Sequence, residues 1–438
     1  MSDKKEVKLP EEPRDTDFED YVAAHLQSAG NFIEKSIIER SKTEILELDI
    51  ICTEYEEDSS PVERLLEIKS GGWGFTEIFK LSGWGKYLKI EDLGLVVCKQ
   101  KSDQDFYVKK ADDIGIDLSY LCNDSNNYEQ TNVLRGKLSD PIDVEYLRFS
   151  YLLERTLLKH LNHKKKSLTA RESYKALEHY YHTLNSVIFF SKNILKKVDK
   201  LYDAFKENPN ITKKVGNESA GNNFNDNHEK IPDQIFNKTF YDHEYTDLTY
   251  SCYVEHRARL AILKSAIDFC LYEQHGIDER ISGEIKMLGF KFSLKTLLPD
   301  NFLINLGIIK DEPYYHKYPV FWQNFLWLFG GMILEDYKEQ EYKILSLKSG
   351  IPVTEIDTAL AVYQKLFPVN GGWFVGPSGN SNIKHMKMMP LPFMGIGANY
   401  RKAIYTEDDS FESLKLTGTY TLSNLISWNN LAVEVMCK

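Results

Sequence analysis

The chain has 438 residues, enough for two or three domains, and its 42% hydrophobic and 27% charged content is typical of a soluble globular protein. A net charge of -11 argues against a protein that coats nucleic acid non-specifically, because such binding depends on Lys and Arg meeting phosphates. The six cysteines include no CxxC pair, which argues against a disulfide framework or a zinc site. The longest apolar stretch, residues 320–334, is too short to span a bilayer comfortably, so we expect a cytoplasmic protein without a membrane segment.

The first elements are expected to be a charged leader, a helix and a strand. Residues 1–14 lack the apolar core of a signal peptide and are expected to be disordered. A helix is expected to begin near Asp15, because apolar residues recur at helical spacing and Thr16 and Glu19 fit a capping box. A first strand is expected over residues 32–40.

Residues 45–52 and 64–69 alternate polar and apolar side chains with the period of a half-buried strand. The charged segment between them has the composition of a turn, so we expect an antiparallel hairpin. That pairing places Asp49 opposite Glu67, at a Cβ separation of about 4.5–5.5 Å, and puts Lys69 on the same face. The other face is expected to reach a core through Leu46, Leu48, Ile50, Leu66 and Ile68.

The elements that follow complete a small mixed α/β domain. A helix is expected over residues 75–90 and a strand over residues 93–98. A short strand over residues 105–108 and a helix over residues 111–121 are expected next. The N-terminal domain is therefore predicted to span residues 15–125.

The remainder of the chain is predicted to be mainly helical, so the expected fold class of the whole chain is α+β. A helical domain is expected over residues 137–341, with a flexible loop near residues 208–233. Residues 342–438 contain a helix-turn-helix-like pair with Thr354 as a cap, followed by a tail. Because the second helix of the pair is poor in Arg and Lys, ordinary packing competes with DNA reading as its role.

The hairpin face that carries Asp49 has the groups that phosphodiester hydrolysis needs. Mg²⁺ prefers oxygen ligands, typically one or two carboxylates completed by waters. Asp49 and Glu67 would supply the carboxylates and the carbonyl of Ile68 a third ligand, with Mn²⁺ as an alternative ion. Lys69 would orient the attacking water or stabilise charge. The competing interpretation is a solvated acidic patch that also includes Glu47.

The order of Glu19 on a helix, Asp49 on a strand and Glu67-Ile68-Lys69 on the next strand resembles the PD-(D/E)XK nuclease superfamily. The resemblance covers residues 15–110 and implies a restriction-endonuclease-like mixed sheet flanked by helices. It implies that Asp49 and Glu67 hold the metal, that Lys69 serves the nucleophilic water and that Glu19 assists metal or water binding. One departure is that Leu48 precedes Asp49, where the motif has proline.

The resemblance predicts a Mg²⁺-dependent endonuclease that cleaves DNA in preference to RNA. The helical region would sense a target or bind a protein partner or a second copy of the chain, and this architecture suggests defence against phage or foreign DNA. One alternative is a catalytically inactive nuclease-like protein that binds a partner or nucleic acid. A second alternative is a ribonuclease resembling the HEPN family, because Arg155 and His160 have its R-x4-H spacing.

Several lysines could contact a phosphate backbone. A lysine-rich zone covers residues 159–166 and 192–200, and Lys80 and Lys86 follow the hairpin on the next helix. Solvated surface lysines are the competing interpretation for both groups.

Overall fold

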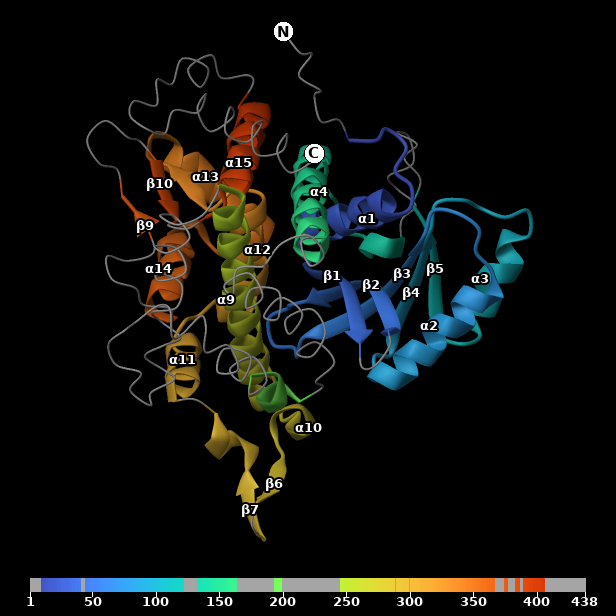
Figure 1. Ribbon diagram of the computed structural model, residues 1–438, viewed down its shortest axis with the longest axis horizontal. Helices are drawn as coiled ribbons and strands as arrows, with labels where there is room; N and C mark the ends of the chain where they lie inside the picture. Colours follow the sequence, from blue (N-terminus) through green and yellow to red (C-terminus); the bar gives the residue numbers. More distant parts are fainter. Residues whose placement is uncertain are drawn as a thin grey trace. The chain divides into compact units, whose positions relative to one another are not determined.

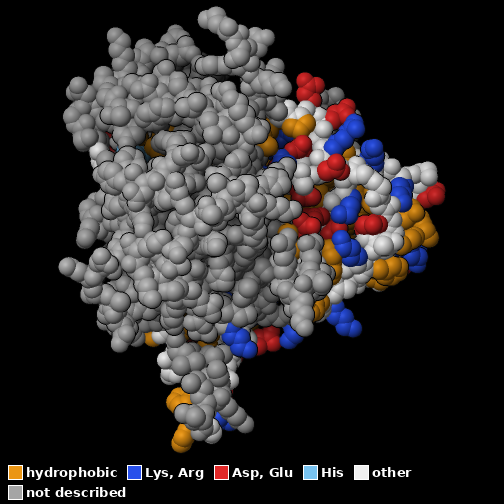
Figure 2. Space-filling view, in the orientation of Figure 1, with side chains coloured by type: hydrophobic (Ala, Val, Ile, Leu, Met, Phe, Trp, Pro, Cys, Tyr) orange, Lys and Arg blue, Asp and Glu red, His pale blue; other side chains and the backbone are white. Residues whose placement is uncertain are grey.

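The computed structural model describes residues 9–40, 44–121, 132–163, 193–198, 245–287, 289–298, 300–366, 374–376, 383–386 and 389–405. The chain forms two compact units, which consist of residues 1–56 with 61–152 and of residues 57–60 with 153–438. The fold class is α+β, as predicted: the first unit holds a five-stranded mixed sheet flanked by helices, and the second is mainly helical (Figure 1). Acidic and basic side chains are interspersed on the face of the first unit that Figure 2 shows.

The sheet of the first unit has its strands in chain order, β1-β2-β3-β4-β5. The first three strands pair antiparallel and the last three pair parallel. The elements of this unit are α1 (Thr16–Ser28), β1 (Phe32–Arg40), β2 (Glu44–Glu54), β3 (Val62–Lys69), α2 (Phe75–Leu88), β4 (Asp92–Val97), α3 (Gln104–Asp112), β5 (Ile116–Tyr120) and the first part of α4 (Pro141–His163), whose residues from 153 on are assigned to the second unit. The predicted hairpin is therefore formed by β2 and β3.

Two predicted elements after β4 are wrong. The strand expected over residues 105–108 lies within helix α3, and the helix expected over residues 111–121 is replaced by strand β5. Gly115, at a φ of 75°, makes the turn between α3 and β5. Because β5 runs parallel to β4, the chain must cross over between them, and a helix is the usual crossover.

Helices α1 and α2 lie on opposite faces of the sheet (Figure 1). Lys35 of β1 pairs with Ile50 of β2, so the two side chains share a face, and Lys35 forms a buried ion pair with Asp20 of α1. Glu67 points to the other face, where Lys80 of α2 contacts it. The predicted apolar face is buried: its five side chains, Leu46, Leu48, Ile50, Leu66 and Ile68, are at most 6% exposed.

The second unit contains longer helices and two small sheets. Its elements include α9 (Tyr245–Gln274), α10 (Asp278–Ile281), β6 (Glu284–Met287), β7 (Phe290–Ser293), α11 (Asp300–Lys310), α12 (Tyr318–Trp327), β8 (Met332–Leu334), α13 (Lys338–Ser349), α14 (Ile356–Leu366), β9 (Phe374–Val375), β10 (Ile383–Met386) and α15 (Leu391–Ile404). A fully buried ion pair joins Arg401 of α15 to Glu341 of α13. The Arg401 guanidinium also donates to the carbonyl of Phe329, at 2.9 Å.

The predicted helix-turn-helix pair corresponds to α13 and α14, joined at Gly350, which has a φ of 76°. Thr354 lies in a 3-10 turn immediately before α14. The exposed positions of α14 are Asp357, Ala361, Gln364 and Lys365, which give this helix no basic face. Packing therefore explains this pair better than DNA reading.

Three further predictions fall on parts of the chain that the structure leaves undescribed: the loop near residues 208–233, most of the lysine-rich zone and the tail after residue 405. No helix among the described residues is long and apolar enough to cross a membrane.

Candidate active site

Strands β2 and β3 separate at the two predicted metal-binding carboxylates. Their pairing ends at Ile50 and Leu66, and one further step in this register would bring Asp49 opposite Glu67. Beyond that point β2 continues to pair with β1, while β3 continues to pair with β4 as far as Lys69. The carboxylates thus lie where two strands of a continuous sheet diverge.

The structure brings Asp49, Glu67 and Lys69 together at this divergence. The Lys69 Nζ atom lies 2.6 Å from Glu67 Oε1 and 3.8 Å from Asp49 Oδ2. The backbone N–H of Ile68, beyond the end of the ladder, donates to Asp49 Oδ2 at 2.8 Å. In an extended strand the N–H and C=O of one residue point the same way, so the Ile68 carbonyl faces the side of Asp49 as well.

Glu67 is the most deeply buried member of the cluster, at 1% exposure. Its Oε1 atom is shared by two ammonium groups, those of Lys69 and of Lys80, the latter at 3.0 Å. Its Oε2 atom is buried and has no hydrogen-bond partner among the described residues. A buried carboxylate oxygen without a partner is costly, and a bound cation is one way to satisfy it.

The pKa of Asp49 is raised from 3.8 to about 6, mainly by burial and also by the nearby charge of Glu67. The ammonium groups of Lys69 and Lys80 and the Ile68 hydrogen bond act in the opposite direction without overcoming these effects. The carboxyl group of Asp49 therefore keeps its proton up to a higher pH than a solvated aspartate does, chiefly because it is buried.

Glu19 lies on α1 and is coupled electrostatically to Asp49. The pKa of Glu19 is raised from 4.5 to about 7, mainly by burial and in part by the charge of Asp49, although Lys35 acts to lower it. Helix α1 begins at Thr16, with Asp15 at the N-cap position and no side-chain cap hydrogen bond. The predicted capping box is therefore wrong, because Glu19 lies one residue beyond the position that such a box requires.

The start of α1 is fixed to the end of β3, which places Glu19 near the cluster. The Ser70 hydroxyl oxygen, one residue after Lys69, accepts a hydrogen bond from the backbone N–H of Asp15 at 2.7 Å. The pKa of Lys69 responds to burial, which lowers it, and to Asp49, Glu67 and Glu19, which together outweigh burial and raise it. Lys69 is therefore held as an ammonium ion in this arrangement.

The sequence did not identify Lys80 as part of the site. It was predicted only as a lysine that could touch DNA, whereas the structure pairs it with Glu67 and places its Nζ atom 4.0 Å from the centre of the Trp84 ring. The i, i+4 spacing of Lys80 and Trp84 predicts their contact within α2. Its pairing with Glu67 follows only from the packing of α2 on the sheet.

The described residues contain no further metal site, and the Arg155 and His160 pair lies on another element. Within the described residues, no group of three or more His, Cys, Asp and Glu side chains has the arrangement of a metal site. Arg155 and His160 both lie on α4, but the side chain of His160 is outside the part that the structure describes.

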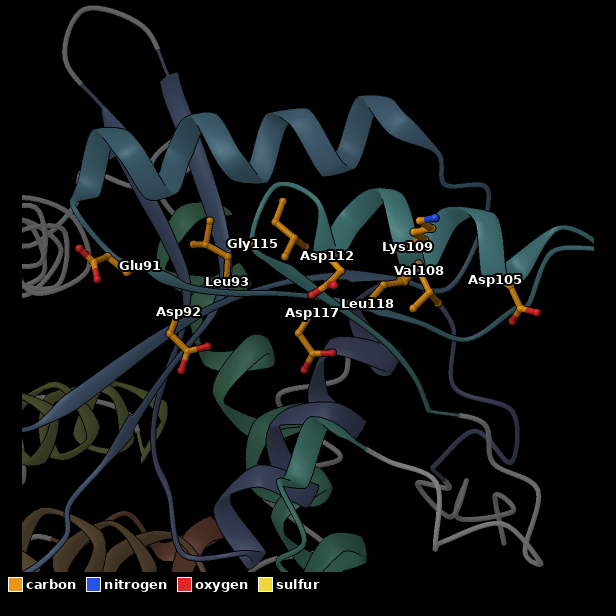
Figure 3. A pocket seen from close by; sticks show the side chains of 11 residues that line it. Glu91, Asp92, Leu93, Asp105, Val108, Lys109, Asp112, Gly115, Asp117 and Leu118 are labelled. Carbon is orange, nitrogen blue, oxygen red and sulfur yellow. The ribbon is translucent and has the colours of Figure 1, made fainter.

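A separate hollow of about 690 Å³ lies against α3, β4 and β5 (Figure 3). Of its carboxylates, Asp92 and Asp117 pair with the buried Arg64 guanidinium, at 3.4 and 2.5 Å. Both stand near the first residues of their strands, whereas open α/β sheets bind ligands at the carboxyl ends of parallel strands. Lys69, by contrast, is the last residue of β3.

No protein-family model matches the chain, and neither a curated protein nor a solved structure is found to match it. The resemblance of residues 15–110 to PD-(D/E)XK nucleases stays a prediction, and the function is inferred from the geometry of the site.

Proposed function

We propose that the first unit is a metal-dependent nuclease that hydrolyses phosphodiester bonds, with DNA favoured over RNA as substrate. The observation that carries this proposal is the pair of carboxylates formed by the buried Glu67 and the largely buried Asp49, with Lys69 between them at the point where β2 and β3 separate. A buried hairpin face has no structural need for two carboxylates and two ammonium groups, since apolar side chains would bury at lower cost.

The residues present fit a divalent cation. The raised pKa of Asp49, caused by burial and by Glu67, reflects a cost of ionising this carboxyl in the metal-free site, and a bound cation would offset that cost. The Lys69 ammonium group already lies between the two carboxylates, so it occupies the kind of position that a cation would take. The buried and unpartnered Oε2 of Glu67 adds a further oxygen for such an ion.

Asp49, Glu67 and the carbonyl of Ile68 would hold Mg²⁺, or alternatively Mn²⁺, and both metals suit oxygen ligands. The bound cation would screen the charge of the scissile phosphate and stabilise the leaving oxygen. Lys69 would then be released from its carboxylates to orient the attacking water and the phosphate. Glu19, with a pKa of about 7 caused by burial and Asp49, is suited to accept a proton from that water near neutral pH.

The competing proposal is a catalytically inactive protein that binds a partner through the same fold. The observation in its favour is that Lys69 and Lys80 both contact Glu67 and neutralise it without a metal. The helical second unit would in either case sense a target or bind a partner or a second copy of the chain. We further propose a cytoplasmic role in defence against foreign DNA, which is suggested by joining a nuclease to a sensor.

The test incubates the full chain with plasmid, linear DNA and RNA, in Mg²⁺, in Mn²⁺ and in EDTA. Asp49→Asn and Lys69→Met are compared with Asp113→Asn and Lys110→Met, which alter an exposed ion pair on and just after α3. Metal-dependent cutting that both site variants lose and both controls keep supports the nuclease. Cutting in EDTA that His160→Ala abolishes would instead favour the ribonuclease alternative.

A metal-binding measurement separates a silent nuclease from an inactive protein. Ligands that bind only the folded state raise its unfolding midpoint. We therefore expect Mn²⁺ to raise the thermal midpoint of the wild type and to have a smaller effect on Asp49→Asn. A wild type that neither cuts nor responds to Mn²⁺ would favour the inactive interaction protein.

A further inference from the structure

The outer face of α2 carries exposed aromatic rings and lysines around an unpacked glycine. Phe79 is 63% exposed and Tyr87 is 54% exposed, which is unusual for large apolar side chains. Lys80 and Lys86 are exposed beside them. Since residues three and four apart share a helix face, all four surround Gly83, the lysines at three residues and the rings at four.

Gly83 has no packing explanation. An added Cβ at Gly83 would meet nothing within 4 Å, whereas at Gly85 it would come within 2.6 Å of the Leu93 side chain. Gly85 is therefore required for the packing of α2 on β4. Glycine inside a helix costs about 1 kcal/mol relative to alanine, so Gly83 weakens α2 without a compensating contact in this structure. A helix backbone left bare on its outer side permits the close approach of a ligand.

The aromatic surface continues onto α3. The Phe75 ring contacts both Phe79 and Phe106, with ring centres 6.4 and 5.9 Å apart. Phe106 is itself 52% exposed. Figure 2 shows hydrophobic side chains gathered at the outer edge of the first unit, with basic and acidic side chains beside them. We call this surface, formed by Phe79, Lys80, Gly83, Lys86, Tyr87 and Phe106, the α2 stripe.

The α2 stripe is connected to the candidate active site through Lys80. Its ammonium group lies 3.0 Å from Glu67 Oε1 and 4.0 Å from the Trp84 ring centre, which places it between the buried carboxylate and the helix surface. No carboxylate among the described residues pairs with Lys86. The six residues of the α2 stripe include two lysines and no carboxylate, and together with its rings they are complementary to a polyanion that carries stacking groups.

We propose that the α2 stripe binds single-stranded nucleic acid and leads it to the carboxylates. Bases would stack on Phe79 and Tyr87, while a phosphate would lie against Gly83 between Lys80 and Lys86. Unpaired bases are required because the bases of a duplex are already stacked on one another and offer the rings no exposed face. This inference rests on the proposed function, which it extends by naming the substrate as unpaired strands.

The test measures binding by the full chain without cleavage. Fluorescence anisotropy of a labelled oligothymidylate in EDTA is compared with that of a duplex of the same length. We expect the single strand to bind more tightly. Phe79→Ser and Tyr87→Ser should each weaken binding about tenfold, which is the loss of one stacked base. Phe290→Ser, at a 69% exposed phenylalanine in β7, is the matched control and should bind as the wild type does.

Two further variants separate binding from folding. Gly83→Ala should raise the thermal midpoint, because alanine favours the helix, and should nevertheless weaken binding by closing the approach to the backbone. Lys86→Gln should reduce the slope of log affinity against log salt by about 0.7, the value for one phosphate contact in a single strand. A variant that is more stable yet binds less well cannot be explained by misfolding.

Contrary results would overturn the inference and leave the nuclease proposal standing. Unchanged affinity in Phe79→Ser and Gly83→Ala would show that the α2 stripe does not bind the strand. A dimer in light scattering that Phe79→Ser dissociates without a change in affinity would show that a second copy covers the surface. Conversely, if the chain binds single strands through the α2 stripe but never cuts them, the binding proposal stands and the nuclease proposal fails.

Discussion

We expect the carboxyl group of Asp49 to destabilise the metal-free protein at neutral pH. Burial and the charge of Glu67 raise its pKa from 3.8 to about 6. The folded chain therefore binds this proton more tightly than the unfolded chain does, and the free energy of unfolding falls as the pH rises through this interval. At about 1.4 kcal/mol per pKa unit, the cost above pH 7 is on the order of 3 kcal/mol.

Asp49→Asn removes the charge and keeps an oxygen that can accept the hydrogen bond of the Ile68 N–H. At pH 8 the variant should be more stable than the wild type, with a thermal midpoint higher by on the order of 5 °C. Near pH 4 the gain should fall below about 1 kcal/mol, because Asp49 is then largely protonated in the folded protein. Asp113→Asn is the control. Lys110 lowers the pKa of that exposed carboxyl, so its negative charge is favourable in the folded protein and its removal should not stabilise the fold.

The assay is thermal unfolding of the full chain at several pH values, followed by circular dichroism. A lower midpoint of Asp49→Asn at pH 8 would refute the reasoning. It would mean that the ionised carboxylate stabilises the fold through Ile68 and Lys69 more than its neighbours repel it.

Three further predictions concern activity and the second unit. Lys69→Met should slow hydrolysis about 10²–10⁴-fold at saturating Mg²⁺ without changing oligonucleotide affinity; an unchanged rate would exclude Lys69 from the chemistry. Cleavage at limiting Mg²⁺ should increase between about pH 5 and pH 8 as Asp49 and Glu19 lose their protons, since their pKa values are raised to about 6 and 7, mainly by burial. A rate that does not change with pH would speak against Asp49 as a metal ligand and Glu19 as a proton acceptor. Arg401→Met leaves Glu341 buried without its cation and should cost about 3–5 kcal/mol in urea unfolding, whereas Arg401→Met with Glu341→Leu should recover much of this loss.

The hairpin could be predicted from the sequence because its alternation has only one solution. A shift of one residue would turn Leu48 and Ile50 to the face of Asp49 and put Glu47 on the apolar face, so the alternation fixes the register that brings Asp49 toward Glu67. The structure agrees, with Leu48 and Ile50 fully buried and Glu47 exposed.

The region after β4 could not be predicted by the same reasoning. Phe106, Tyr107 and Val108 have the composition of a strand, yet they lie on α3, where the Tyr107 ring packs on Phe75 at 4.9 Å between ring centres. That aromatic packing depends on α2, which is distant in sequence. In β5 the alternation of Ile116 and Leu118 was present, but it is too short to be distinguished from a helix by its period alone.

The details of the site depend on departures from regular structure that no alternation encodes. The β1–β2 pairing passes from Lys35 with Ile50 to Ile37 with Leu48, and the residue between, Ser36, has a φ of 53°. This irregularity faces Asp49, whose β3 partner is likewise missing from the ladder. Asp15, at a φ of 49°, is a third departure from regular structure, and its backbone N–H donates a hydrogen bond to the Ser70 hydroxyl oxygen.

Such backbone conformations cost about 1 kcal/mol or more at residues other than glycine, and they concentrate at functional sites. An acidic patch on a regular hairpin would need none of them.

If β2 and β3 stayed paired through Asp49, the Ile68 N–H would bond to a backbone carbonyl of β2, and the Asp49 carboxylate would have no backbone donor. The separation of the strands instead gives that N–H to Asp49 and leaves Glu67 Oε2 buried without a partner among the described residues. A solvated acidic patch would leave its carboxylates open to water, whereas Glu67 is 1% exposed, as we expect of the proposed cation site.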